Sequence, residues 1–108
     1  MNFTSPGWPS PYAINLDCMW TIASQPETYI KLVITDFDLQ TEGCNDYLLI
    51  RRPNEDVVVG CGGKETAPMV FYSSGNYTTV TFISDAVASS SSRGFRAEVH
   101  VLQGNNNL

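Results

Sequence analysis

Acidic side chains gather around one connection of the chain, and their chemistry is the first to consider. Asp36, Asp38, Glu42 and Asp46 fall within one segment, and Asp85 follows a later apolar run. Calcium takes several hard oxygen ligands, which loops at one end of a β-fold supply. If the two strand ends lie close, Asp46 and Asp85 share one ion; a solvated acidic loop is the simpler alternative. We therefore treat a Ca²⁺ site as a hypothesis.

The three cysteines cannot all pair with one another in disulfides. Cys18, Cys44 and Cys61 allow at most one internal disulfide, so one thiol is left over. An odd cysteine in an extracellular type of chain indicates an external partner, an intermolecular bridge or a free thiol. No C-x-x-C pair exists, and His100, the single histidine, lies far along the chain from Cys18. This pattern argues against a zinc site.

The residues for nucleophilic catalysis are also missing, because a nucleophile needs a base beside it. His100 alternates with Arg96 and Glu98 on the solvent side of a predicted strand. The glycines around Cys61 lack the Lys-Ser/Thr ending of a phosphate-binding loop. We predict that the chain is not an enzyme.

Composition and charge exclude several further classes. The chain has 108 residues, 43% hydrophobic and 16% charged, which fits one folded domain. Six basic against eleven acidic residues give a net charge of −5, the wrong sign for nucleic acid or anionic lipid. No apolar run approaches the roughly 18 residues of a membrane span. We predict no nucleic-acid binding and no membrane insertion by this chain.

Two acceptor triplets for N-glycosylation favour a secreted or cell-surface chain. They begin at Asn2 and at Asn76, and neither has proline in the middle. Residues 1–10 carry no basic and apolar pattern of a signal peptide, so we expect the targeting segment to lie outside these residues.

The apolar residues alternate with a period of two almost everywhere, which predicts an all-β fold. Strands are expected at 29–35, 47–51, 77–83 and 94–101, with shorter ones at 19–22, 57–59 and 69–72. Many short strands separated by turn residues are typical of a β-sandwich or barrel. The predicted inward residues are Ile30, Leu32, Ile34, Leu48, Ile50, Thr78, Val80, Phe82, Phe95, Ala97, Val99 and Val101. We expect one domain over 1–102 and a tail over 103–108.

Two tryptophans and two tyrosines raise the question of which aromatic side chains reach the surface. Trp20 is expected in the core, whereas Trp8, Tyr12 and Tyr72 are expected to be partly exposed. An exposed aromatic cluster favours a partner surface, although ordinary sandwich packing explains most of these residues.

Several ordered motifs resemble those of CUB domains, from Phe3 to about Val101. Residues 3–12 resemble the opening F-x-S-P-x-Y-P-x-x-Y, with Trp8 where the family usually has Tyr. The further matches are C-x-W-x-I at 18–22, Cys-Gly at 61–62, S-S-G-N at 73–76, F-x-S-D at 82–85 and G-F-x-A at 94–97. Residues 30–39 resemble I-x-L-x-F-x-x-F-x-L with Ile34 at the usual Phe, and residues 44–48 resemble C-x-x-D-x-L with one residue fewer between Cys and Asp.

The resemblance implies a jelly-roll-like β-sandwich of two antiparallel sheets. It further implies a non-catalytic extracellular module that binds proteins. In many members a Ca²⁺ ion at one end of the sandwich orders loops that accept a basic side chain of the partner. The positions that match the calcium ligands are Gln40, Asp46 and Asp85, with Glu42 close by. The alternative is a carbohydrate-binding module of the spermadhesin type.

The chain departs from the family pattern at three places. Gln40 replaces a carboxylate, which predicts a weak calcium site of about 10⁻⁴–10⁻³ M. The turn before Asp46 is one residue short. The cysteine that pairs with Cys18 in the family would lie before residue 1, as in a fragment with Met1 as an added start. The resemblance therefore implies a Cys44–Cys61 disulfide and leaves Cys18 unpaired within the chain. A Cys18 thiol buried beside Trp20 would be inert, whereas an exposed one would link a dimer.

Overall fold

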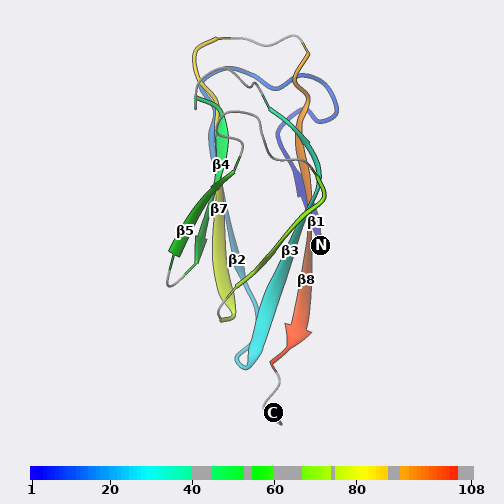
Figure 1. Cartoon of the computed structure of the whole chain (residues 1–108), viewed down its shortest axis with the longest axis vertical. Helices are drawn as coiled ribbons and strands as arrows, with labels where there is room; N and C mark the ends of the chain where they lie inside the picture. The colour runs from blue at the N-terminus through cyan, green and yellow to red at the C-terminus, as the bar shows by residue number, and fades with distance from the viewer. Residues whose placement is uncertain (40–44, 53–54, 60–66, 74, 88–90, 105–108) are drawn as a thin grey trace.

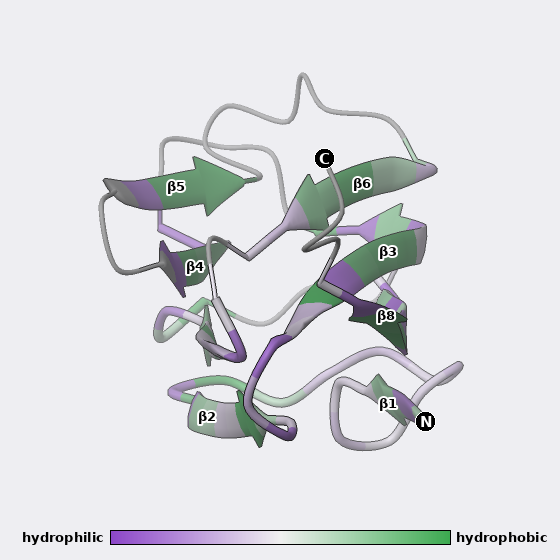
Figure 2. Ribbon diagram, turned by 90° about the horizontal axis from the view of Figure 1, so that it is seen from below, coloured by the Kyte–Doolittle hydropathy of each residue, from purple (hydrophilic) through white to green (hydrophobic). Residues whose placement is uncertain are grey.

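The chain folds into two four-stranded antiparallel sheets that face each other, as a computed structural model shows (Figure 1). The structure describes residues 1–39, 45–52, 55–59, 67–73, 75–87 and 91–104. One sheet has the order β1-β8-β3-β6 and the other the order β2-β7-β4-β5. Viewed along the strands, the two sheets form separate layers with β5 and β6 at one open edge (Figure 2). The predicted sandwich of two antiparallel sheets is confirmed.

The strands follow the alternating runs of the sequence. Their bounds are β1 Asn2–Thr4, β2 Asp17–Ala23, β3 Thr28–Asp38, β4 Tyr47–Arg52, β5 Glu55–Val59, β6 Met69–Tyr72, β7 Tyr77–Ile83 and β8 Gly94–Gln103. No helix occurs in the described ranges. No helix in this part of the chain is therefore long and apolar enough to cross a membrane.

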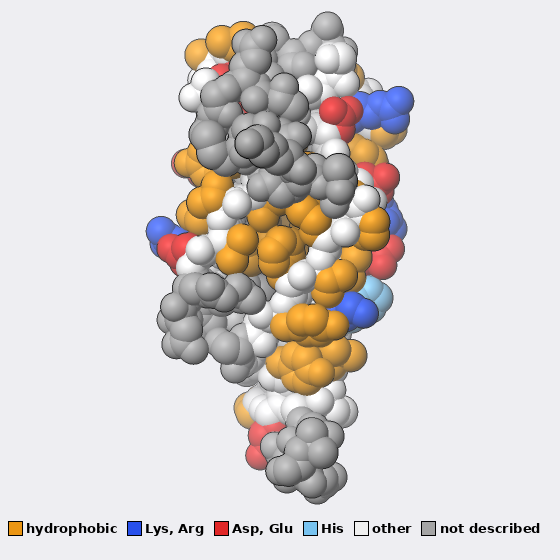
Figure 3. All heavy atoms as spheres, viewed as in Figure 1, with side chains coloured by type: hydrophobic (Ala, Val, Ile, Leu, Met, Phe, Trp, Pro, Cys, Tyr) orange, Lys and Arg blue, Asp and Glu red, His pale blue; other side chains and the backbone are white. Residues whose placement is uncertain are grey.

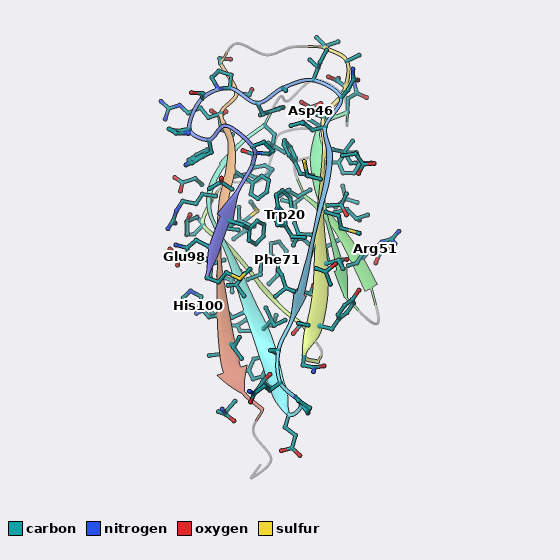
Figure 4. The ribbon with its side chains drawn as sticks, turned by 180° about the vertical axis from the view of Figure 1, so that it is seen from behind. Trp20, Asp46, Arg51, Phe71, Glu98 and His100 are labelled. Atoms are coloured by element: carbon teal, nitrogen blue, oxygen red, sulfur yellow. The ribbon has the colours of Figure 1, made fainter. Side chains whose placement is uncertain are left out.

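The core lies between the sheets, because successive strand residues point to opposite faces. Every predicted inward residue is buried except one. Trp20 and Phe71 also point into this space, partly buried against the core (Figure 4). Val101 was predicted inward and is 55% exposed. It pairs with Ile30 at the end of β8, where β3 and β8 continue beyond the strands of the other sheet (Figure 1).

Several strands extend beyond their predicted bounds, and one strand was not predicted. β1 was not predicted, since three residues are too few to show a period; it pairs with β8 in the register Phe3↔Ala97. β3 runs to Asp38 instead of Thr35, with a shift of register between Ile34 and Asp36. A bulge of this kind lets a strand continue past the point where its alternation breaks.

The last described residues continue β8 beyond the expected domain end at 102. β8 reaches Gln103, and the Gly104 N–H donates to the Glu27 carbonyl at 2.7 Å. Residues 105–108 of the predicted tail lie outside the described residues.

Candidate functional site

The pairing of β4 with β7 brings two predicted calcium ligands together at one end of the sandwich. Tyr47 at the start of β4 pairs with Ile83 at the end of β7, so Asp46 and Asp85 follow on the same side. Asp46 Oδ1 accepts a hydrogen bond from the backbone N–H of Asp85 at 2.9 Å. The labelled Asp46 lies near the end of the molecule that is opposite the C-terminus (Figure 4).

Asp46 is held from its other side by Tyr12. The carboxylate is only 1% exposed, and its Oδ2 accepts a hydrogen bond from the Tyr12 hydroxyl at 2.5 Å. The prediction that Tyr12 is partly exposed was wrong: it is buried, with its ring edge-on to Phe82 at 5.1 Å. A tyrosine buries its ring when the hydroxyl reaches a polar partner, and Asp46 is that partner.

The loop after β7 is tied to the segment before β2. Ser84 Oγ accepts from the Leu16 N–H and donates to the Ala13 carbonyl, both at 2.8 Å. The Asn15 N–H donates to the Asp85 carbonyl at 2.8 Å, and Asp85 Oδ1 accepts from the Val87 N–H at 2.9 Å. These bonds fix the main chain around Asp85 while its carboxylate stays partly exposed.

The other acids of the predicted cluster lie elsewhere. Asp36 and Asp38 were expected around the connection that leads to Asp46, and both are exposed residues of β3. Asp36 Oδ2 accepts from the Thr35 hydroxyl at 2.9 Å, and Asp38 Oδ2 from the Arg93 N–H at 3.2 Å. The described part of the chain has no group of three metal-binding side chains.

Four predicted site residues lie outside the described residues: Gln40, Glu42, Cys44 and Cys61. The fit to calcium therefore rests on Asp46 and Asp85. The Asp46 carboxylate contacts the Asp85 backbone amide, and both residues carry hard oxygen donors of the kind that calcium takes. The described residues thus fit part of a calcium shell.

The remaining predicted site residues are spread over the molecule. Cys18 is a free thiol on the inner face of β2, half-buried beside the core. Asn76 is also half-buried, and its Nδ2 donates to the Ser24 carbonyl at 2.7 Å. Asn2 is exposed on β1. None of the three lies in the Asp46–Asp85 cluster.

His100 points to solvent, as predicted, on the outer face of the β1-β8-β3-β6 sheet (Figure 4). Its Nε2 lies 3.3 Å from Glu98, and Arg96 lies 3.0 Å from the same carboxylate. The hydrogen bond from Arg96 and then that from His100 hold the pKa of Glu98 below its usual value.

Comparison with known proteins agrees with this arrangement. The family model described as CUB domain matches residues 1–99. Cubilin of Sus scrofa is 35% identical over 102 residues, which are 89% of this chain and 3% of cubilin. The chain therefore spans only a small part of that relative.

Two solved structures share the fold at this level of detail. The CUB1-EGF-CUB2 domain of human MASP-1/3 matches with a TM-score of 0.84 and 26% identity, over 95% of this chain and 41% of that chain. The crystal structure of the MASP-1 CUB2 domain bound to Ca²⁺ matches with a TM-score of 0.70 and 25% identity, over 92% and 89%. CUB domains occur in secreted or extracellular proteins, which confirms the predicted localisation. The chain belongs to the CUB family, as an extracellular protein-interaction module.

Proposed function

We propose that the chain recognises an extracellular protein partner through the end of the sandwich that carries Asp46 and Asp85, with Ca²⁺ as a weak ligand there. The observation that carries the proposal is the contact between the Asp46 carboxylate and the Asp85 amide. It joins the side chain of one acid to the backbone of another that is 39 positions away in the sequence. A partner's Lys or Arg is the group that such an acidic end attracts.

Calcium, when bound, would link the loop after β7 to the segment before β4 through these two side chains. The relative with bound Ca²⁺ supports the choice of ion. Gln40 supplies a neutral oxygen where other members have a carboxylate, and fewer charged ligands weaken calcium binding. We expect a dissociation constant of about 10⁻⁴–10⁻³ M, as in other extracellular modules.

Titration calorimetry of the whole chain with CaCl₂ tests this site. Wild type should give binding heat in the millimolar range, and Asp85→Ala should give none. Asp38→Ala is the matched control, because Asp38 is an exposed acid outside the cluster. Absent heat in wild type, or equal heat in wild type and Asp85→Ala, contradicts the calcium site.

A Cys44–Cys61 disulfide is part of the same proposal. Its support is the register Leu48↔Val59, which sets the start of β4 beside the end of β5. A bridge that closes a loop of this size contributes about 3 kcal/mol. Non-reducing peptide mass spectrometry should find this pair with Cys18 free, and a bridge that involves Cys18 contradicts it.

Glycan binding is the second candidate, and one observation favours it. The rings of Tyr29 and Tyr72 lie 6.2 Å apart on the outer face of β3 and β6, and Tyr72 is 49% exposed. Exposed aromatic rings give flat, partly polar contact area for a ligand. A calcium-free glycan array compared with Tyr72→Ala tests this function, and binding that survives the substitution argues against it.

A further inference from the structure

The outer face of the β2-β7-β4-β5 sheet carries an apolar patch at its centre. Its members share that face by register: Met19 aligns with Leu49 and Val58 through Thr81, and Tyr47 aligns with Ile83. We call Met19, Tyr47, Leu49, Val58 and Ile83 the outer apolar patch. Met19 is 67% exposed and Val58 49% exposed, on the two edge strands of the sheet.

The opposite outer face is different. Charged side chains cross its centre: Lys31 pairs with His100, and Glu98 lies next to Arg96. Figure 3 shows acidic, basic and histidine side chains along the β8 side, whereas the opposite profile has hydrophobic side chains above a single pair of charges. The solvent face of an antiparallel sheet is ordinarily polar. Exposed apolar side chains also occur on the opposite outer face, at Val70 and Tyr72, but Lys31 and the charged row of β8 lie beside them. Among the described residues, the outer apolar patch has no charged side chain at its centre.

The rim of the patch is acidic toward the proposed binding end. Asp17 aligns with Ile83 on the same face and is exposed, and Asp85 follows Ile83 by two positions. The basic residue of this face, among those the structure describes, is Arg51. Its Nε lies 3.7 Å from Asp56 Oδ2, at the other end of the patch. Among the described residues of this face, the acids open to an incoming basic group are therefore those at the Asp17 and Asp85 end.

We propose that the outer apolar patch docks a segment of the partner protein that carries Lys or Arg a few positions from apolar side chains. This inference rests on the proposed function, because the basic residue would reach the Asp46–Asp85 end while the apolar ones cover the patch. Two strand residues span roughly 7 Å, so the Leu49 row lies roughly 7 Å from Asp17 and up to roughly 13 Å from Asp85. Side chains two to four positions apart in an extended segment cover that distance.

Central apolar residues of an interface carry most of its binding energy, and charges at the rim set orientation and partner choice. Met19 suits such a surface because its unbranched side chain adapts to the partner's shape. In this proposal, the patch supplies most of the binding energy, and the acidic end sets the orientation of the bound segment.

Random peptides displayed on phage, selected on the whole immobilised chain with calcium present, test the partner chemistry. Enriched peptides should combine Lys or Arg with apolar residues two to four positions away. Enrichment of acidic peptides, or of apolar peptides without a basic residue, overturns the proposal.

A synthetic copy of the best peptide then tests the surface. The double variant Leu49→Thr, Val58→Thr should weaken its binding at least about tenfold. Val33→Thr, Val70→Thr is the matched control on the opposite outer face, where Val70 is 47% exposed, and it should bind as wild type does. If the patch double variant fails to fold, Met19→Gln takes its place, since that side chain is largely exposed.

Asp85→Asn separates the two proposals. Binding lost in Asp85→Asn but kept in the patch variants overturns the patch and leaves the binding end standing. Binding lost in the patch variants but kept in Asp85→Asn supports the patch and contradicts the role of that end. A wild-type dimer in sedimentation that dissociates in the patch variants makes a second copy the occupant, which overturns the proposed partner.

Discussion

Ser5 and Gly94 fix the start of the chain against the start of β8. Ser5 is fully buried, its N–H donates to the Phe95 carbonyl at 3.0 Å, and its Oγ accepts from the Phe95 N–H at 3.1 Å. Gly94 has a φ of +104°, and a Cβ there would lie 1.9 Å from Ser5 Oγ. Glycine is required at this position for both its conformation and its lack of a side chain.

Gly94→Ala should lower the free energy of unfolding by about 2–4 kcal/mol, because strain and a clash with Ser5 add up. Urea unfolding followed by tryptophan fluorescence measures the change. Gly75→Ala is the control, since a Cβ at that position would have no neighbouring atom within 4 Å, and it should stay within about 0.5 kcal/mol. Equal effects of the two substitutions would contradict this account.

Tyr12 and Asp46 form the second residue-scale feature. Tyr12→Phe removes the hydroxyl that Asp46 Oδ2 accepts from and leaves the contact with Phe82 in place. We expect a loss of about 1.5–3 kcal/mol, the usual range for hydrogen bonds to charged groups. Chemical unfolding checks this, with Tyr77→Phe as a control at a half-exposed tyrosine. An effect no larger than that of the control argues against the hydrogen bond.

At the scale of the element, β8 carries a row of charged side chains, and two of them lower the pKa of the third. Arg96 and His100 both contact Glu98, and the hydrogen bond from Arg96 is the larger cause of its lowered pKa. A carboxyl with a lowered folded pKa stabilises the fold above its unfolded pKa. That contribution is lost as the pH falls through the folded pKa.

The Glu98 carboxyl carbon, followed by NMR against pH, should titrate below the ordinary value of 4.5. Arg96→Gln should raise the midpoint more than His100→Gln does, because the Arg96 hydrogen bond is the larger cause. The reverse order of the two variants would show that His100 dominates instead.

Alternation in the sequence predicted six of the strands because each has enough residues to show a period of two, and the β-branched run 57–59 predicted β5. Val101 shows the limit of this signal: alternation assigns a face, but it does not say where the opposite sheet ends. Tyr12 shows another limit, since a segment rich in Pro and Gly has no period that would assign its ring to the core. The Asp46–Asp85 contact depends on β4 pairing with β7, which only the resemblance made foreseeable.

At the scale of the whole molecule, the sandwich is elongated, with extents of 49 × 23 × 22 Å, and the Asp46 end lies far from the C-terminus (Figure 1). The proposed binding end and the outer apolar patch follow one another along β4 and β7. One sheet thus has an acidic end with apolar side chains below it, while the other combines the charged row of β8 with exposed apolar side chains of β6. The proposed partner surface therefore lies on one side of the sandwich, along β4 and β7.

Calcium should stabilise the entire fold, because Asp46 and Asp85 meet only when β4 and β7 are paired and the unfolded chain offers no such site. For a dissociation constant of about 10⁻⁴–10⁻³ M, roughly 10 mM calcium adds about 1.4–2.7 kcal/mol. In a domain of this size that shift raises Tm by roughly 5–15 °C. Scanning calorimetry measures it, with sodium chloride at matched ionic strength and with magnesium, which demands a stricter octahedral shell, as controls. Asp85→Ala should lose the calcium-dependent rise in Tm. An equal rise in Tm with all three salts would mean that screening of the net charge of −5, and not a calcium site, stabilises the chain.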